Sequence, residues 1–225
     1  MGGRSVTQEY YMLAVNEKGY MPAMRSAESN AGLVVAAVAE LLLNGVITMG
    51  DKKLLVGKEL AVVKELPGEL GYLASLYGYL REKTRSTGKL MNDYLASTGS
   101  RIRQLTCELG AALVEAGAAK SAEGGLFGGK VLYVPERDGK EAVVRRLKSA
   151  IVADGELSVH DAALLAILRE TKNLSQYFSA FERDVLQERL KELKQNPRNR
   201  ELAKMIEYVS DMTGLMAVLF VVGAN

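Results

Sequence analysis

The chain has 225 residues, 48% of them apolar and 25% charged, and its 29 basic against 27 acidic side chains give a formal net charge of +2. This length can bury a substantial core in one large or two small domains, and the near-neutral charge excludes a protein that coats nucleic acid by bulk charge. The single cysteine, Cys107, excludes an internal disulfide, and with the single histidine, His160, it leaves no His/Cys set for a zinc site.

The N-terminal part of the chain begins with a short apolar run. We expect residues 1–9 to form a flexible N-terminus. The run Tyr10–Val15 (YYMLAV) is predicted as a strand, ended by the turn signal at residues 16–19. The loop that follows, residues 20–25, is unusually rich in apolar side chains for a loop.

A long apolar helix is predicted from Ala31 to Asn44. Asn30 is a plausible N-cap, and Gly45 follows the helix at a position where the left-handed conformation is easily adopted. Residues 46–56 then predict a small β-hairpin with its turn at residues 50–52.

The remainder of the chain is predicted to be helical apart from a second hairpin. Residues 118–134 hold two Gly-Gly pairs followed by an apolar run, which is typical of a hairpin. Leucines at three- and four-residue steps indicate helices on both sides of it. The predicted helices span residues 67–80, 89–96, 100–116, 140–152, 158–169, 179–195 and 199–222. The fold class is therefore mainly α, a single helical domain over residues 10–225 with two small peripheral β-hairpins.

The sequence predicts no segment that crosses a membrane and no reactive centre. The apolar stretches 31–43 and 214–224 are shorter than the roughly 20 residues of a spanning helix, so both are expected in the core, and the first residues lack the apolar region of a cleaved signal. Cys107 is expected to be an inert core residue, and its lone thiol fits a reducing compartment. His160 is expected to be an ordinary surface residue. We expect no metal, no cofactor and no catalysis.

Basic side chains concentrate in two parts of the sequence. The first window, residues 81–103, carries a net charge of +4 from the cations Arg81, Lys83, Arg85, Lys89, Arg101 and Arg103 against Glu82 and Asp93. It is either a solvated helix face or a patch that faces anionic lipid, where each basic residue contributes roughly 1 kcal/mol. The second cluster is either solvated or an interface between copies, and consists of Arg137, Lys140, Arg145, Arg146 and Lys148.

The apolar loop before the first long helix also has two interpretations. Tyr20, Met21 and Met24 either fold back onto the core or insert shallowly into a lipid interface. Arg25 adds a positive charge beside them and could join Arg103. An apolar tip beside basic side chains provides the two signals of reversible membrane attachment.

Four blocks of the sequence, taken in order, resemble the Golgi phosphoprotein 3 family. The first is YYMLAV with NEKGY and AGLVVAAVAELLLNGVI, and the second is the helix LTCELGAALVEAGAA. The third is GGKVLYVPERD followed by RRLKSAI, and the fourth is the terminal MTGLMAVLFVV. The resemblance covers residues 10–222. The long polar N-terminal arm of eukaryotic members is not present in this sequence, which indicates a prokaryotic relative.

The resemblance implies a helical, non-catalytic adaptor that binds phosphatidylinositol 4-phosphate. Its expected location is cytoplasmic and peripheral, on the cytosolic face of a membrane, with protein clients as possible partners and no nucleic acid. Family members self-associate through the later hairpin, here about residues 120–134. The residues expected in that contact are Leu126, Phe127 and Val131.

The family's headgroup residues can be placed on this sequence by position. The loop Trp of the family falls at Met24 or Arg25, and the first-helix Arg falls at Val34. Of an Arg pair three residues apart, one is kept as Arg103 and the other falls at Thr106. The expected headgroup residues are Arg25, Arg81, Arg103 and Thr106, with Tyr20, Met21 and Met24 in the membrane-contacting loop.

Three classes of function follow from these observations. The first is a peripheral membrane adaptor for anionic phospholipid headgroups. The second is a self-associating, protein-binding helical scaffold without the lipid site, consistent with Val34 and Thr106. An enzyme is third, since no carboxylate pair or nucleophile system is evident in the sequence.

Overall fold

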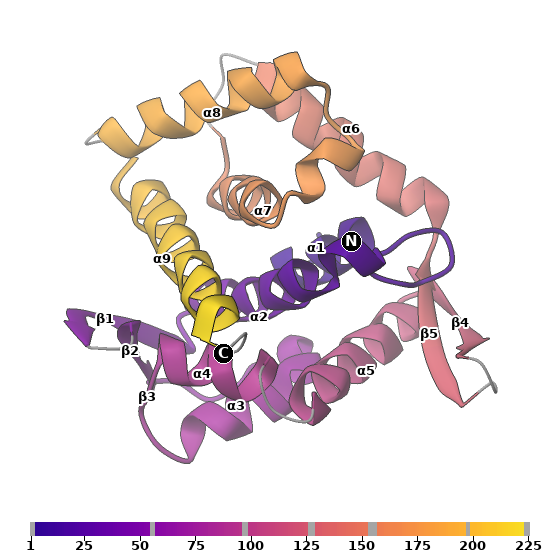
Figure 1. The fold of residues 1–225 in the computed structure, drawn as a ribbon, viewed down its shortest axis with the longest axis horizontal. Coiled ribbons are helices and arrows are strands. Elements are labelled where there is room, and N and C mark those ends of the chain that lie inside the picture. Colours follow the sequence, from indigo (N-terminus) through magenta and orange to yellow (C-terminus); the bar gives the residue numbers. More distant parts are fainter. Residues whose placement is uncertain are drawn as a thin grey trace.

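The computed structural model describes residues 3–54, 57–95, 99–125, 129–152, 157–196 and 199–222. Within these ranges the chain is mostly helical with two small antiparallel sheets (Figure 1), which confirms the predicted mainly α fold with small hairpins. The α-helices are α1 (Val6–Ala14), α2 (Ser26–Leu43), α3 (Ala74–Arg81), α4 (Thr87–Leu95), α5 (Ser100–Glu115), α6 (Arg137–Val152), α7 (Val159–Glu170), α8 (Ala180–Gln195) and α9 (Arg200–Val222). Short 3₁₀ helices are η1 (Ala23–Arg25), η2 (Gly68–Leu73) and η3 (Asn173–Gln176).

The first predicted strand is wrong, because Tyr10–Val15 belongs to α1 and its C-cap. Residues 5–9, expected within a flexible N-terminus, instead begin α1, since Ser5 caps the helix with a reciprocal hydrogen-bond pair to Gln8, and Val6, at its first position, is buried. Tyr10–Val15 is buried at every position, and a short continuous apolar run has no period that distinguishes a strand from a buried helix.

Helix α2 begins five residues before the predicted start. Asn30 lies inside the helix, and no side chain caps its N-terminus at Arg25. Gly45 follows the helix with φ +64°, as the sequence predicts. An 18-residue window of the apolar segment Ala23–Leu43 is long and apolar enough to cross a membrane, but 67% of that window is buried inside the fold, as expected of a core helix.

The first hairpin exists, but its turn lies later than predicted. Strand β1 (Ile47–Leu54) runs through the expected turn at residues 50–52, with a register shift between Met49 and Lys53, and pairs with β2 (Gly57–Val62). A third strand, β3 (Arg85–Ser86), pairs with β2. The second hairpin, β4 (Ala119–Gly124) with β5 (Lys130–Pro135), confirms the sequence prediction.

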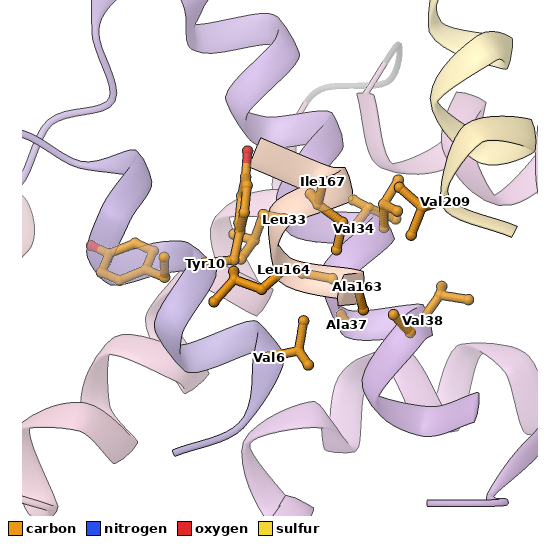
Figure 2. Packing of buried hydrophobic residues seen from close by; sticks show 14 of the residues in the cluster. Val6, Tyr10, Leu33, Val34, Ala37, Val38, Ala163, Leu164, Ile167 and Val209 are labelled. Carbon is orange, nitrogen blue, oxygen red and sulfur yellow. The ribbon is translucent and has the colours of Figure 1, made fainter. Parts of the chain in front are cut away.

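Helices α1, α2, α7 and α9 pack together around the middle of the molecule (Figures 1 and 2). Their buried faces meet through small and branched side chains, including Val6, Val34, Ala163 and Val209. The three-stranded sheet lies beside α3 and α4, the β4–β5 hairpin lies beside α5, and α6 and α8 pack on each other outside α7 (Figure 1). This arrangement leaves Met24 of the loop, the basic side chains Arg81, Lys83, Arg101 and Arg103, and Val131 of the later hairpin exposed.

Candidate functional site

The loop before α2 is partly anchored and partly exposed. The Asn16 side chain accepts hydrogen bonds from the backbone N–H groups of Lys18 (2.9 Å) and Tyr20 (3.1 Å), which fixes the turn after α1. The Tyr20 hydroxyl accepts the Gly125 N–H at 3.2 Å, so this ring lies against the later hairpin. Met21 packs on the core, and Met24 is 95% exposed on η1. Of the two methionines, Met24 alone therefore presents its full apolar surface to the outside.

Arg25 is held by the turn that follows α7. Its Nη1 donates to the backbone carbonyl of Lys172 (2.7 Å) and to the Ser175 hydroxyl (3.0 Å). Lys172 adopts φ +60°, which turns the chain so that its carbonyl can accept this bond. These bonds lead to η3 and not to α5, which carries Arg103 on its exposed face. The structure therefore anchors Arg25 beside Met24 but records no contact that brings it to Arg103.

Two guanidinium groups of the basic window lie close to the ring of Tyr79, which precedes the window on α3. The Arg85 and Arg101 Cζ atoms lie 3.8 Å and 4.5 Å from the centroid of the Tyr79 ring. The Tyr79 hydroxyl donates to Asp93 Oδ2 at 2.7 Å. Burial, and then the bond to the Asp93 carboxylate, raise the pKa of Tyr79 to about 12. Arg85 and Arg101 are thereby joined through one tyrosine, although they are sixteen positions apart in the sequence.

The other cations of the window divide into paired and exposed side chains. Arg85 also pairs with Glu82 at 2.6 Å, and Lys89 pairs with Asp93 at 2.5 Å. The exposed cations, which we call the basic patch, are Arg81, Lys83, Arg101 and Arg103. Part of the predicted charge excess is therefore neutralised locally, and what remains exposed comes from α3, the segment after it, and α5.

Two of the expected headgroup positions cannot donate to an anion in this structure. The Thr106 hydroxyl donates to the Ile102 carbonyl at 2.8 Å, one turn earlier in α5. Val34 is fully buried in the core. Any recognition of an anion near α5 therefore depends on Arg103 and its exposed neighbours.

The later hairpin is only partly described. Leu126 and Phe127, two of the three residues expected at a contact between copies, lie outside the described residues. Val131, the third, is 55% exposed on β5. The strand is attached to the body through Tyr133, whose carbonyl accepts the Tyr11 hydroxyl at 3.2 Å and whose ring packs against Gly110.

An ion-pair network around the buried Glu9 carboxylate, which sequence analysis missed, joins α1, α6 and α7 through the half-exposed Arg146. Glu9 is 2% exposed and receives both terminal nitrogens of Arg146, at 2.8 Å and 2.6 Å. Arg146 also donates to Asp161 at 2.8 Å, and His160 Nε2 lies 2.8 Å from Glu9 Oε2. His160 is therefore a partly buried network member, not the ordinary surface residue we expected. The sequence feature that could have indicated this network is Glu9, an acidic residue directly before the apolar run Tyr10–Val15.

We interpret this network as one that stabilises the packing of the three helices, and not as a metal-binding site. The ligand atoms of Glu9, His160 and Asp161 lie within 4.8 Å of one another. However, the Arg146 guanidinium already bonds both Glu9 and Asp161, so a cation would have to displace it. Burial would raise the pKa of Glu9, but the Arg146 hydrogen bonds, with those of His160, outweigh it and lower the pKa below its usual value.

Cys107 is exposed, which corrects the expectation of an inert core residue. Leu105 and Leu109 are buried, and a residue two positions from each lies about 200° around the helix, on its opposite face. Glu108 bonds Gln104 and the Ser75 backbone, while His160 bonds Glu9. An enzyme, the third class of function, would need converging acid–base groups, whereas these bonds hold Glu108 and His160 on separate partners.

Comparison with known proteins gives one family match. A family model described as Golgi phosphoprotein 3 (GPP34) matches residues 6–209. No curated protein matches the chain significantly. The matched range begins at the first residue of α1, includes all of α2 to α8 and ends at the buried Val209 within α9.

Proposed function

Since the chain belongs to the Golgi phosphoprotein 3 family, we propose that it is a non-catalytic peripheral adaptor that docks on anionic phospholipid headgroups. The observation that carries the proposal is the 95% exposed Met24 beside the anchored Arg25. An apolar tip with nearby positive charge is the combination that holds proteins reversibly at membrane surfaces. The proposed location is cytoplasmic and peripheral, on the cytosolic face of a membrane.

The basic patch supplies the electrostatic part of this proposal. Arg81, Lys83, Arg101 and Arg103 are all exposed, and each contributes roughly 1 kcal/mol near an anionic surface. Arg103 is the residue we propose for direct headgroup contact, because an arginine binds phosphate oxygens in a bidentate manner. Tyr20 and Met21 anchor the loop to the protein, since Tyr20 contacts the later hairpin and Met21 packs on the core.

We expect Met24→Asp to reduce sedimentation with liposomes that contain phosphatidylinositol 4-phosphate by roughly fivefold or more, because it replaces the apolar tip by a charge that anionic lipid repels. Arg103→Glu should weaken sedimentation by a similar factor. The matched control is Phe181→Asp on α8, which changes another exposed apolar side chain (76% exposed) outside the loop and should pellet like the unchanged protein. Equal and negligible pelleting with and without the lipid would remove lipid recognition.

A self-associating scaffold is the second candidate, and the exposed Val131 on β5 favours it. We expect Val131→Glu to lower the molar mass measured by light scattering if copies meet through this strand, because a charge would be buried in the contact. Val63→Glu is the matched control, since Val63 is a similarly exposed valine after β2. An unchanged mass for Val131→Glu would exclude β5 as the interface.

A further inference from the structure

A groove of about 900 Å³ runs between α6, the β4–β5 hairpin and the turn after α1. Its lining includes four cations of the second basic cluster, which the proposed membrane surface does not use. They are Arg137, Lys140, Arg145 and Lys148, and β4 adds Lys120. The fifth member of that cluster, Arg146, instead joins the network of Glu9.

The two faces of α6 explain this division. Val143, Leu147 and Ile151 follow one another at four-residue steps and are buried. The groove residues Arg137, Lys140, Val144 and Lys148 repeat at three or four residues on another side of the helix. The helix therefore holds the core with one stripe and presents a second, cationic stripe to the groove.

The groove also has apolar surface. Val134 and Pro135 from β5, Val144 from α6 and Tyr177 after η3 line it and are half-buried. The Tyr177 hydroxyl donates to the Leu13 carbonyl at 2.7 Å, which fixes the ring. Such a floor suits an aliphatic side chain placed between charged neighbours.

Lys140 is the most enclosed of the groove cations. Its ammonium donates to the Val15 carbonyl at 2.6 Å and lies 5.4 Å from the centroid of the Tyr177 ring. Burial lowers the pKa of Lys140. An incoming carboxylate would restore an ionic partner to this partly desolvated ammonium.

Three groove cations, Arg137, Arg145 and Lys120, form ion pairs at the surface, and we call them the rim cations. Arg137 pairs with Glu141 at 2.8 Å, and Arg145 reaches the same carboxylate at 3.8 Å. Lys120 pairs with Glu136 at 2.8 Å. Exposed ion pairs of this kind contribute little to stability, so their arginines and lysine can exchange partners when another anion arrives.

We propose that this groove binds an extended acidic peptide segment of a partner protein, with carboxylates on its rim cations and an aliphatic side chain on its floor. Five groove cations stand against three lining glutamates, Glu17, Glu136 and Glu141, while Glu182 of α8 pairs with Lys148 at 2.9 Å, so the groove keeps a small positive excess. The stripe from Arg137 to Lys148 covers eleven helical steps, roughly 16 Å, which matches about five extended residues. The interspersed glutamates would repel a uniform polyanion, which favours a peptide over nucleic acid or a lipid surface.

The test measures fluorescence anisotropy of a labelled peptide of alternating glutamate and leucine. We expect saturable binding of this acidic peptide that weakens with added salt. The matched peptide, with lysine in place of each glutamate, should bind with at least about tenfold lower affinity than the acidic peptide. The double variant Arg137→Glu, Arg145→Glu should lose at least about tenfold in affinity for the acidic peptide, because it reverses two exposed rim charges. Lys191→Glu, an exposed lysine on α8 outside the groove, should stay within about twofold.

Failure of this proposal can be distinguished from failure of membrane docking. Met24→Asp should keep peptide binding, and the double variant should keep sedimentation with liposomes, because the two surfaces use different residues. Circular dichroism and thermal unfolding verify that each variant is folded. No saturable binding of the acidic peptide, equal affinity for the lysine peptide, or an unchanged affinity in the double variant would each overturn the proposal. A double variant that loses liposome binding would overturn it as well, since its cations would then serve the membrane.

Discussion

Replacing Arg146 by methionine is expected to destabilise the protein by about 3 kcal/mol, because it leaves the buried Glu9 carboxylate without its bidentate partner. Glu9 would retain His160 alone, and Asp161 would lose its bond to the guanidinium. The measurement is the free energy of unfolding from a urea titration near neutral pH. Arg145→Met is the matched control: Arg145 is an exposed neighbour that pairs loosely with Glu141 at 3.8 Å, so we expect a change below about 0.5 kcal/mol.

The loss of stability should depend on pH with a defined sign. Glu9 has a lowered pKa in the folded protein, so its ionised form contributes stability above the ordinary value of 4.5, and this contribution is lost as pH falls through the lower folded pKa. In Arg146→Met, burial remains while the main opposing cause is gone, so the pKa of Glu9 should rise. The variant then takes up a proton at a higher pH, and its stability deficit should shrink between about pH 7 and about pH 4. A deficit that stays constant over this range would contradict the assignment to Glu9.

The second large effect is expected at Gly32, where α2 passes close to α1 and α7. A Cβ atom there would lie 2.1 Å from the Tyr10 hydroxyl oxygen and 2.5 Å from Thr171 Cγ2. Neither side chain can withdraw, since both are fully buried, the Tyr10 hydroxyl donates to the Ser29 carbonyl, and the Asn173 amide donates to both hydroxyls. We expect Gly32→Ala to destabilise the protein by about 2 kcal/mol, measured as a lower midpoint of urea unfolding.

Gly78→Ala separates this steric effect from helix propensity. Gly78 also lies inside a helix, α3, but a Cβ atom there meets nothing within 4 Å. Alanine should therefore stabilise the protein by up to about 1 kcal/mol. Similar results for the two variants would show that the close approach of α2 to α1 and α7 is not what requires glycine at position 32.

The resemblance identified the family from four blocks taken together, but it did not identify the individual residues of a binding site. The four blocks lie at α1–α2, α5, the β4–β5 hairpin with α6, and α9, and each contributes buried side chains to the core, such as Leu13, Leu109, Leu147 and Met212, which packing constrains. The headgroup positions are single side chains, and here they include the buried Val34 and Thr106, whose hydroxyl bonds to its own helix. The overall pattern can persist while such individual contacts change.

The sequence by itself determined the fold class, the later hairpin and most helices. Periodic leucines specify α5, and Ser158 specifies the start of α7 because its side chain accepts the Asp161 N–H at 3.0 Å. These signals are local, arising from residues three or four positions apart. Where the local pattern had no period, as at Tyr10–Val15, the sequence alone predicted a strand, and only packing against α2 and α7 decided on a helix.

Tertiary structure alone decided which charged residues from distant parts of the chain meet. Arg146 looked like one more member of a basic cluster, but its partners Glu9 and Asp161 come from α1 and α7. Arg25 faces η3, and Arg101 and Arg85 converge on Tyr79. A charge pattern along a chain counts cations without showing their direction, whereas an ion pair requires a particular separation and angle that only the packing of distant helices provides.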